Sequence, residues 1–310
     1  MKIYCRKINV NKKELTQLKG PLLLAANHPN SFLDAVILDI LFKDPIVSLA
    51  RGDVFKNKWA AKILMKLRIL PVYRLREGAE NLSENYRTFD TCVEIFKRNG
   101  IVLIFSEGLC QNEWHLRPLK KGTARLALQS WKENIDLKIL PVGLNYSSHR
   151  RFAKSIEINF GKPFSTKDLD LSGNEGMKIQ AINNELLTQL QSLVYEIDQD
   201  DHKKIEETFD SENKNLKKSI LLIPAKIGFI LHAPLYRMMQ KSLGKRVARS
   251  VHSDSIYMFF LMFLYPVFLL LTTLLCWLFT KSSWSLLTPF VLAFSAYAYA
   301  QTKNILDHQS

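Results

Sequence analysis

The sequence predicts an α/β domain with a mixed, largely parallel sheet flanked by helices, followed by a C-terminal transmembrane helical hairpin. Apolar runs of strand length alternate with segments of helix length through the N-terminal part of the chain. The strand-like runs are almost continuously apolar, as in strands that are covered on both faces. Near the C-terminus, residues 256–279 form an uncharged run of 24 residues.

The elements of the α/β domain follow from these runs and from the segments between them. Pro and Gly bound several of the apolar runs, and Asn99-Gly100 is a typical helix C-terminus. The predicted strands are residues 21–27, 45–50, 100–106, 138–146 and 155–161. The predicted helices between and after them are residues 31–42, 56–67, 84–99, 120–134 and 176–197.

The composition divides the chain near residue 205, after which a polar stretch precedes the apolar C-terminal region. We expect a catalytic domain at 1–205 and a membrane region at 206–310. At about 1.5 Å per residue, the run at 256–279 can cross a hydrocarbon core of roughly 30 Å, whereas a hairpin buried in a soluble core is the alternative. The membrane region is then predicted to hold an interfacial or re-entrant segment at 219–240 and transmembrane helices at 256–279 and 284–301.

The distribution of basic residues predicts the orientation of this hairpin. Residues 241–249 and Lys303 make both outer flanks basic, while the connecting loop holds only Lys281. By the positive-inside bias, both chain ends and the catalytic domain should lie on the cytoplasmic side. The basic N-terminus is not followed by the apolar stretch of a signal peptide.

The overall charge and the cysteines restrict the function classes. The net charge is +14, from 43 Lys and Arg against 29 Asp and Glu, which favours an anionic partner such as nucleic acid, lipid headgroups or a phosphorylated substrate. A nucleic-acid motif is not recognisable, and a terminal apolar hairpin has no role in such binding. The four cysteines are far apart in the sequence, so neither a disulfide framework nor a zinc site is expected. We therefore expect the protein in a reducing compartment.

The stretch NHPNSFLDA, which follows the first predicted strand, has two interpretations. Ser31 and Asp34 form an S-x-x-D pattern that is typical of a capped helix start. Alternatively, His28 lies at the carboxyl end of a buried strand, where α/β sheets bind ligands. There it can act as a general base that Asp34 orients through its other ring nitrogen.

Two later stretches add candidate groups for an anionic ligand. Lys120 and Lys121 precede a predicted helix, and a helix N-terminus beside lysines attracts anions. Arg74 and Arg76 follow another strand-like run, and guanidinium groups bind phosphate in a bidentate manner. An isolated surface charge is the alternative for each one, but together they indicate a ligand that carries phosphate.

Four blocks in the same order resemble the glycerolipid acyltransferases, over roughly residues 15–165. ANHPNSFLDA is similar to the family block NH-x4-D, and ILPVYR is similar to G-x-I-x-V-x-R. IFSEG followed by LRPLKKGTARLA is similar to FPEGTRS followed by F-K-x-G, and ILPVGLNY is similar to the short V/I-P-V block.

The resemblance implies a role for each matched residue. His28 would deprotonate an acceptor hydroxyl that attacks an acyl thioester, and Asp34 would orient His28. Pro141 would position a loop near the acyl donor, and neither a metal nor another cofactor is expected beyond acyl-CoA or acyl carrier protein as co-substrate. The implied substrate-binding residues and their candidate substitutes are Asn27, Arg74, Arg76, Ser106, Glu107, Gly108, Arg117, Lys120 and Lys121.

The sequence departs from the family pattern at three places. Five residues separate His28 from Asp34 instead of four, Ser106 replaces a proline, and Cys110 replaces an arginine. We therefore predict a membrane-bound O-acyltransferase that acts on glycerol 3-phosphate or its 1-acyl form, with membrane lipids as partners. The alternatives are another lipid acceptor, such as a lyso-aminolipid or a lysophospholipid in remodelling, and an inactive lipid-binding protein of the same fold.

Overall fold

The computed structural model describes residues 3–72, 80–209, 220–248 and 250–307. Within these residues, seven strands form a single sheet in the order β1-β7-β6-β2-β5-β3-β4. β2, β3, β4, β5 and β6 run parallel, whereas β7 is antiparallel to β6 and β1 is parallel to β7. The strands are β1 (Cys5–Val10), β2 (Leu22–Ala26), β3 (Ile46–Arg51), β4 (Ile69–Val72), β5 (Ile101–Phe105), β6 (Lys138–Tyr146) and β7 (Lys154–Phe160).

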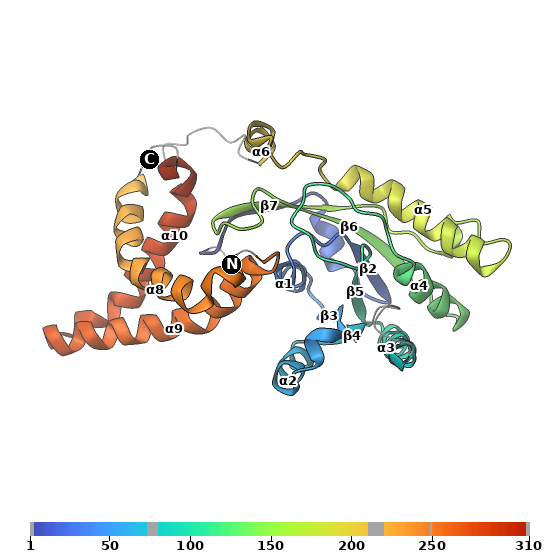
Figure 1. The fold of residues 1–310 in the computed structure, drawn as a ribbon, viewed down its shortest axis with the longest axis horizontal. Helices are drawn as coiled ribbons and strands as arrows, with labels where there is room; N and C mark the ends of the chain where they lie inside the picture. The colour runs from blue at the N-terminus through green and yellow to red at the C-terminus, as the bar shows by residue number, and fades with distance from the viewer. Residues whose placement is uncertain (1–2, 73–79, 210–219, 249, 308–310) are drawn as a thin grey trace.

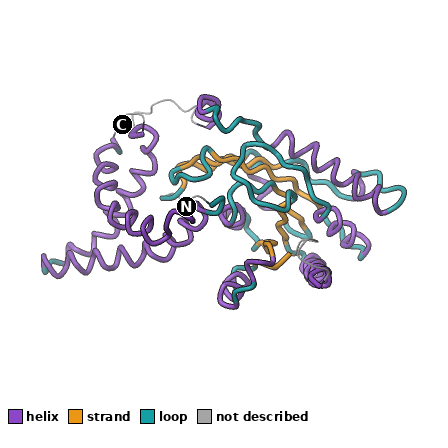
Figure 2. Tube along the Cα trace, viewed as in Figure 1, coloured by secondary structure: helices purple, strands orange, loops and turns teal. Residues whose placement is uncertain are grey.

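Helices cover both faces of this sheet, and a separate group of helices follows it in the chain (Figures 1 and 2). The helices that belong to the sheet domain are α1 (Phe32–Leu41), α2 (Lys58–Lys66), α3 (Glu80–Lys97), α4 (Gly122–Lys132), α5 (Glu175–Leu193) and α6 (His202–Phe209). The C-terminal group contains α8 (Leu222–Ala248), α9 (Ser253–Thr280) and α10 (Thr288–Asp307).

The alternation of side chains along β2 shows how the two cores arise. Leu22, Leu24 and Ala26 pack with α1 on one face of the sheet. Leu23 and Ala25 point to the other face, where they join buried residues of α3, α4 and α5. Because β2 is apolar on both faces, its carboxyl end is held rigidly, and the loop that follows it starts from a fixed point.

The predicted mixed, largely parallel sheet with flanking helices is confirmed. β1 was missing from the prediction. It lies at the edge of the sheet, and its sequence CRKINV contains Arg6, Lys7 and Asn9, so it lacks the apolar run that marks the inner strands.

The C-terminal region consists of helices, but the predicted pair of membrane spans is not confirmed. Within the described residues, α9 is the one helix whose length and apolarity suit a membrane crossing. The second predicted span, 284–301, begins in a short 3-10 helix and continues as α10, which packs along α8. The segment predicted at 219–240 as interfacial lies largely within α8, which continues through Pro234 and bends at Gly244.

Candidate active site

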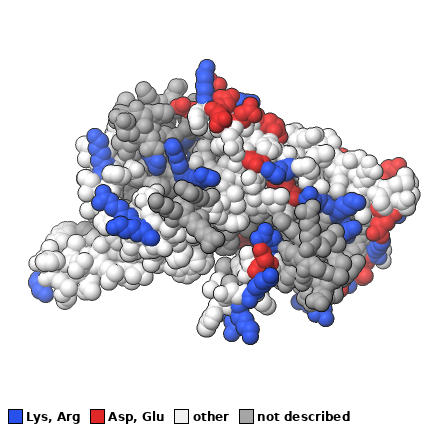
Figure 3. Space-filling model, in the orientation of Figure 1, with Lys and Arg blue, Asp and Glu red and all other residues white. Residues whose placement is uncertain are grey.

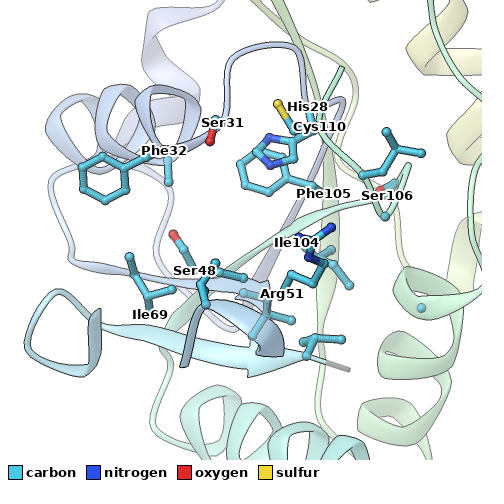
Figure 4. Close-up of a pocket in the computed structure, with 18 of the residues that line it drawn as sticks. His28, Ser31, Phe32, Ser48, Arg51, Ile69, Ile104, Phe105, Ser106 and Cys110 are labelled. Atoms are coloured by element: carbon cyan, nitrogen blue, oxygen red, sulfur yellow. The ribbon is translucent and has the colours of Figure 1, made fainter. Parts of the chain in front are cut away.

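A large cavity opens at the carboxyl ends of β2, β3 and β5, with a volume of about 1890 Å³. Its wall is mostly apolar and includes side chains from α1, α2 and the first turns of α9. Figure 4 shows His28, Ser31 and Cys110 along one side of the cavity and Ser48 with Arg51 along the other. A cavity at this end of a parallel sheet is the usual position of a ligand site in α/β proteins.

His28 lines this cavity and contacts the buried Asp34. The Nδ1 atom of His28 is 2.9 Å from the Oδ2 atom of Asp34, and the imidazole stacks on Phe105 with ring centroids 3.7 Å apart. A carboxylate accepts hydrogen bonds, so Nδ1 is the His28 nitrogen that donates to Asp34, and Nε2 takes no part in this contact. The side chain of His28 is 18% exposed and that of Asp34 is 0% exposed.

The carboxylate of Asp34 is oriented by three donors. Besides His28, the backbone N–H of Asn30 donates to Oδ2 at 2.8 Å, and the hydroxyl of Tyr146 donates to Oδ1 at 2.6 Å. Burial raises the pKa of the Tyr146 hydroxyl well above its usual value, and Asp34 raises it further, so the hydroxyl keeps its proton. Both oxygen atoms of the fully buried Asp34 carboxylate therefore accept hydrogen bonds.

Ser31 and Asp34 stand at the N-cap and in the first turn of α1, as the capping interpretation expected, but the side-chain hydrogen bonds of a capping box are not formed. Among the described residues, the Ser31 side chain makes no capping hydrogen bond, and the Asp34 carboxylate accepts from His28, Asn30 and Tyr146 instead. Ser31 has φ 55° and ψ −133°, and this sharp turn takes up the extra residue between His28 and Asp34. The five-residue separation therefore does not keep the two side chains apart.

Glu107 supports the backbone of the same loop. Its carboxylate accepts the N–H of His28 at 3.0 Å and the N–H of Arg117 at 3.0 Å. Burial raises the pKa of Glu107, while these two hydrogen bonds act in the opposite direction. Glu107 thus fixes the position of His28 without lining the large cavity.

Ser106, Gly108, Lys120 and Lys121 also line the cavity. The N–H of Lys120 donates to the carbonyl of Ser106 at 2.7 Å, and the Ser106 hydroxyl lies 3.0 Å from that of Thr123. Gly108 has φ 67°, and a Cβ atom there would approach Lys120 Cγ to 3.0 Å. Lys120 and Lys121 line the cavity where α4 begins, so a helix N-terminus and two lysines border the same space.

Four predicted site residues lie elsewhere or cannot be placed. The amide of Asn27 exchanges two hydrogen bonds with the backbone of Leu144 and is structural. The guanidinium of Arg117 pairs with Glu113 outside the large cavity. Arg74 and Arg76 lie outside the described residues.

Pro141 lies within β6, next to Ala25 of β2 in register. Its expected role in positioning a loop near the acyl donor stays a prediction. Its backbone carbonyl accepts the N–H of Gly161, so this residue helps to join β6 to the segment after β7.

Several residues of the site were not predicted. Arg51 ends β3 and lines the cavity, where its guanidinium also pairs with Asp53. The rule that ligands bind at strand ends would have found it. His252 and Ser255 of the α9 start line the same cavity, but no local pattern connects them with residues more than 200 positions earlier.

Known proteins resemble the N-terminal part of this chain. Residues 7–145 match the family model described as Acyltransferase. A Bacillus subtilis protein named 1-acyl-sn-glycerol-3-phosphate acyltransferase is 26% identical over 121 residues, which cover 39% of this chain and 56% of that protein. A Schizosaccharomyces pombe protein described as an uncharacterized acyltransferase is 33% identical over 146 residues, which cover 46% of this chain and 20% of that protein.

A solved structure also aligns with the chain. It is the 1-acyl-sn-glycerophosphate acyltransferase PlsC of Thermotoga maritima, with 14% identity and a TM-score of 0.42 over 61% of this chain and 71% of that one. The matches to the curated relatives thus span from one fifth to just over half of their lengths. The family-model match, residues 7–145, falls on the sheet domain that carries His28 and Asp34.

Proposed function

Because the chain belongs to the glycerolipid acyltransferase family, we propose that it transfers a fatty acyl group from a thioester donor, acyl-CoA or acyl carrier protein, to a glycerol-type hydroxyl. Glycerol 3-phosphate or its 1-acyl form is the proposed acceptor. The observation that carries this proposal is the hydrogen-bonded pair of His28 and Asp34 in the wall of a large, mostly apolar cavity.

The chemistry that we propose uses His28 as a general base. With Nδ1 donating to Asp34, Nε2 accepts the proton of the acceptor hydroxyl as its oxygen attacks the thioester carbonyl. Asp34 stabilises the imidazolium that forms. The C–O bond forms, the C–S bond breaks, and the imidazolium returns the proton to the leaving thiolate, so that neither a metal nor a covalent acyl-enzyme is required.

The cavity lining supports a substrate with a long apolar part and an anionic head. Apolar side chains of α1, α2 and α9 are suited to an acyl chain, and they include Phe32, Trp59 and Phe259. Lys120 and Lys121 at the start of α4 are suited to a phosphate, and Arg74 and Arg76 remain further candidates. This chain has Cys110 where the family pattern has an arginine, and we propose that these cations bind the phosphate in its place.

We propose that α9 anchors the enzyme in the membrane with the catalytic domain on the cytoplasmic side. The helix has 28 residues, about 42 Å at 1.5 Å per residue, which exceeds a hydrocarbon core of roughly 30 Å. Its buried residues lie in its first two turns, and the rest is uncharged, mostly apolar, and half-buried or exposed. The active site would then lie close to the bilayer surface, where lipid substrates and products partition.

Acyl transfer by the full chain in lipid vesicles tests this function. With acyl-CoA or acyl carrier protein as donor and the two acceptors in turn, His28→Ala should lower kcat by about 10²- to 10⁴-fold. His115→Ala is the matched control, because His115 is half-exposed and pairs with Glu113 outside the cavity. Transfer that continues at the wild-type rate in His28→Ala would exclude the proposed mechanism.

A further inference from the structure

We propose that Asn30 and Ser255 are positioning residues through which the start of α9 holds the loop between β2 and α1, so that His28 and Asp34 stay aligned only while α9 packs against the sheet domain. This inference rests on the proposed function of the His28–Asp34 pair. It gives α9 a role in positioning the catalytic residues, in addition to its proposed role as a membrane anchor.

Asn30 joins the two parts directly. Its backbone N–H donates to the Asp34 oxygen that also faces His28, at 2.8 Å. Its side-chain amide donates to Oδ2 of Asp254 at 2.9 Å, and its carbonyl accepts the Ser255 hydroxyl at 2.8 Å. Both the side chain and the carbonyl of Asn30 are thus bound to the first turn of α9, while its N–H is bound to the catalytic carboxylate.

Ser255 also holds the first turn of α1. Its hydroxyl oxygen accepts the backbone N–H of Leu33 at 3.0 Å, and that N–H is one of the groups that a helix start leaves without an internal partner. Leu33 precedes Asp34 directly. The Ser255 hydroxyl therefore joins Asn30 to Leu33, and both residues lie between His28 and Asp34 in the sequence.

The first turn of α9 is itself firmly attached to the sheet. The buried Asp254 carboxylate is paired with Lys154 of β7, and the hydroxyl of Tyr4 also donates to it. Asp254 and Lys154 are both almost fully buried, at 1% and 2% exposure. A buried and fully paired charge of this kind fixes position and orientation more strictly than apolar packing does.

The loop between these attachments is strained. Ser31 has φ 55°, a region that non-glycine residues rarely adopt, and such strain persists only where the surroundings impose it. The contacts from α9 lie on both sides of Ser31, at Asn30 and Leu33. In addition, His252 Nδ1 lies 2.8 Å from the Ser31 hydroxyl. Without these contacts the loop would relax, and the N–H of Asn30 would move away from Asp34.

The test compares variants of the full chain in vesicles, with kcat and KM for the acyl donor measured separately. Asn30→Ala and Ser255→Ala should each lower kcat by about 10- to 100-fold, because small displacements of aligned groups have effects of this size. The KM for the donor should stay close to that of the wild type, since the apolar side chains of the cavity wall are unchanged. Ser255→Thr keeps the hydroxyl and should retain most of the activity.

Tyr265→Phe is the matched control. The Tyr265 hydroxyl lies 3.2 Å from Nε2 of His232 on α8, so this variant removes a hydrogen bond of α9 outside its first turn, and its kcat should remain close to that of the wild type. Wild-type kcat in both Asn30→Ala and Ser255→Ala would overturn the inference, and so would an equal loss in Tyr265→Phe. An inactive wild-type protein would instead refute the proposed function. If Asn30→Ala does not fold, as judged by circular dichroism, the Ser255→Ala and Ser255→Thr pair decides.

Discussion

His149 shows how a single buried side chain can make the stability of this protein depend on pH. It is 5% exposed and packs against Trp114, with ring centroids 4.5 Å apart. Within the described residues, its buried Nε2 atom finds no hydrogen-bond partner. Burial, together with the nearby charges of Lys154 and Arg150, lowers the pKa of His149 to about 3.

We predict that the protein loses stability as the pH falls below about 6.5, the usual pKa of an unfolded histidine. Between that pH and about 3 the unfolded chain binds a proton at His149 and the folded chain does not, so the free energy of unfolding falls with decreasing pH. The slope from this residue approaches about 1.4 kcal/mol per pH unit. Unfolding of the detergent-solubilised protein at pH 7 and pH 5 measures it.

His149→Gln should reduce the difference in stability between the two pH values, whatever its effect at pH 7. His115→Gln is the control, because His115 is 48% exposed and should leave the difference unchanged. An unchanged difference in His149→Gln would show that His149 does not cause the acid sensitivity.

At the scale of elements, the junction of β6 with the end of α5 depends on a glycine. A Cβ atom on Gly143 would lie 2.4 Å from the carbonyl oxygen of Leu193. That carbonyl accepts the side-chain amides of Asn145 and Asn159, both at 2.9 Å. A larger residue at 143 must push the end of α5 away from the sheet and break these two bonds.

Gly143→Ala should therefore destabilise the fold by about 1–3 kcal/mol, the usual effect of overfilling a packed site. Gly122→Ala is the matched control, because its Cβ would meet only Ile104 Cδ1 at an ordinary 3.6 Å, in a helix where alanine is favoured. Denaturant unfolding of both variants checks the prediction. Equal stability in the two would show that α5 moves away without loss.

The elements also show which parts of the fold and the site the sequence could predict. The inner strands were predictable because residues such as Leu23 and Leu24 are buried on opposite faces, which produces continuous apolar runs. His28 and Asp34 were predictable because they follow one of those runs. Asn30, Tyr146 and Ser255 were not, because their partners lie on other elements and depend on how the chain packs.

At the scale of the whole molecule, α9 divides into a packed start and a projecting apolar remainder. Its buried residues are Ser253, Asp254, Ser255 and Met258, all in its first two turns. The remainder projects from the molecule in Figure 1, and Figure 3 shows this projection without coloured charges except at its far end. The first turns thus pack with the sheet domain, and about 20 residues remain, which is long enough to cross a bilayer.

Charges placed in the projecting part of α9 should weaken its insertion. Leu270 and Leu274 are 70% and 50% exposed, and an arginine near the centre of a span opposes insertion by about 2.5–3.5 kcal/mol. We expect the Leu270→Arg, Leu274→Arg double variant to shift from the membrane pellet to the soluble fraction after alkaline carbonate extraction. The wild-type protein should stay in the pellet after both carbonate and high-salt washes, because salt screens only charge attraction to lipid headgroups.

Met177→Arg is the control for the introduced charge, because Met177 is 56% exposed on α5 of the sheet domain. It should remain in the membrane pellet. If the α9 double variant also stays in the membrane pellet after carbonate extraction, another segment must anchor the chain. In that case α9 is not what brings the active site to the bilayer surface. If it is released but keeps acyl transfer on detergent-dispersed substrate, anchoring by the projecting part and loop positioning by the first turn are separable properties of one helix.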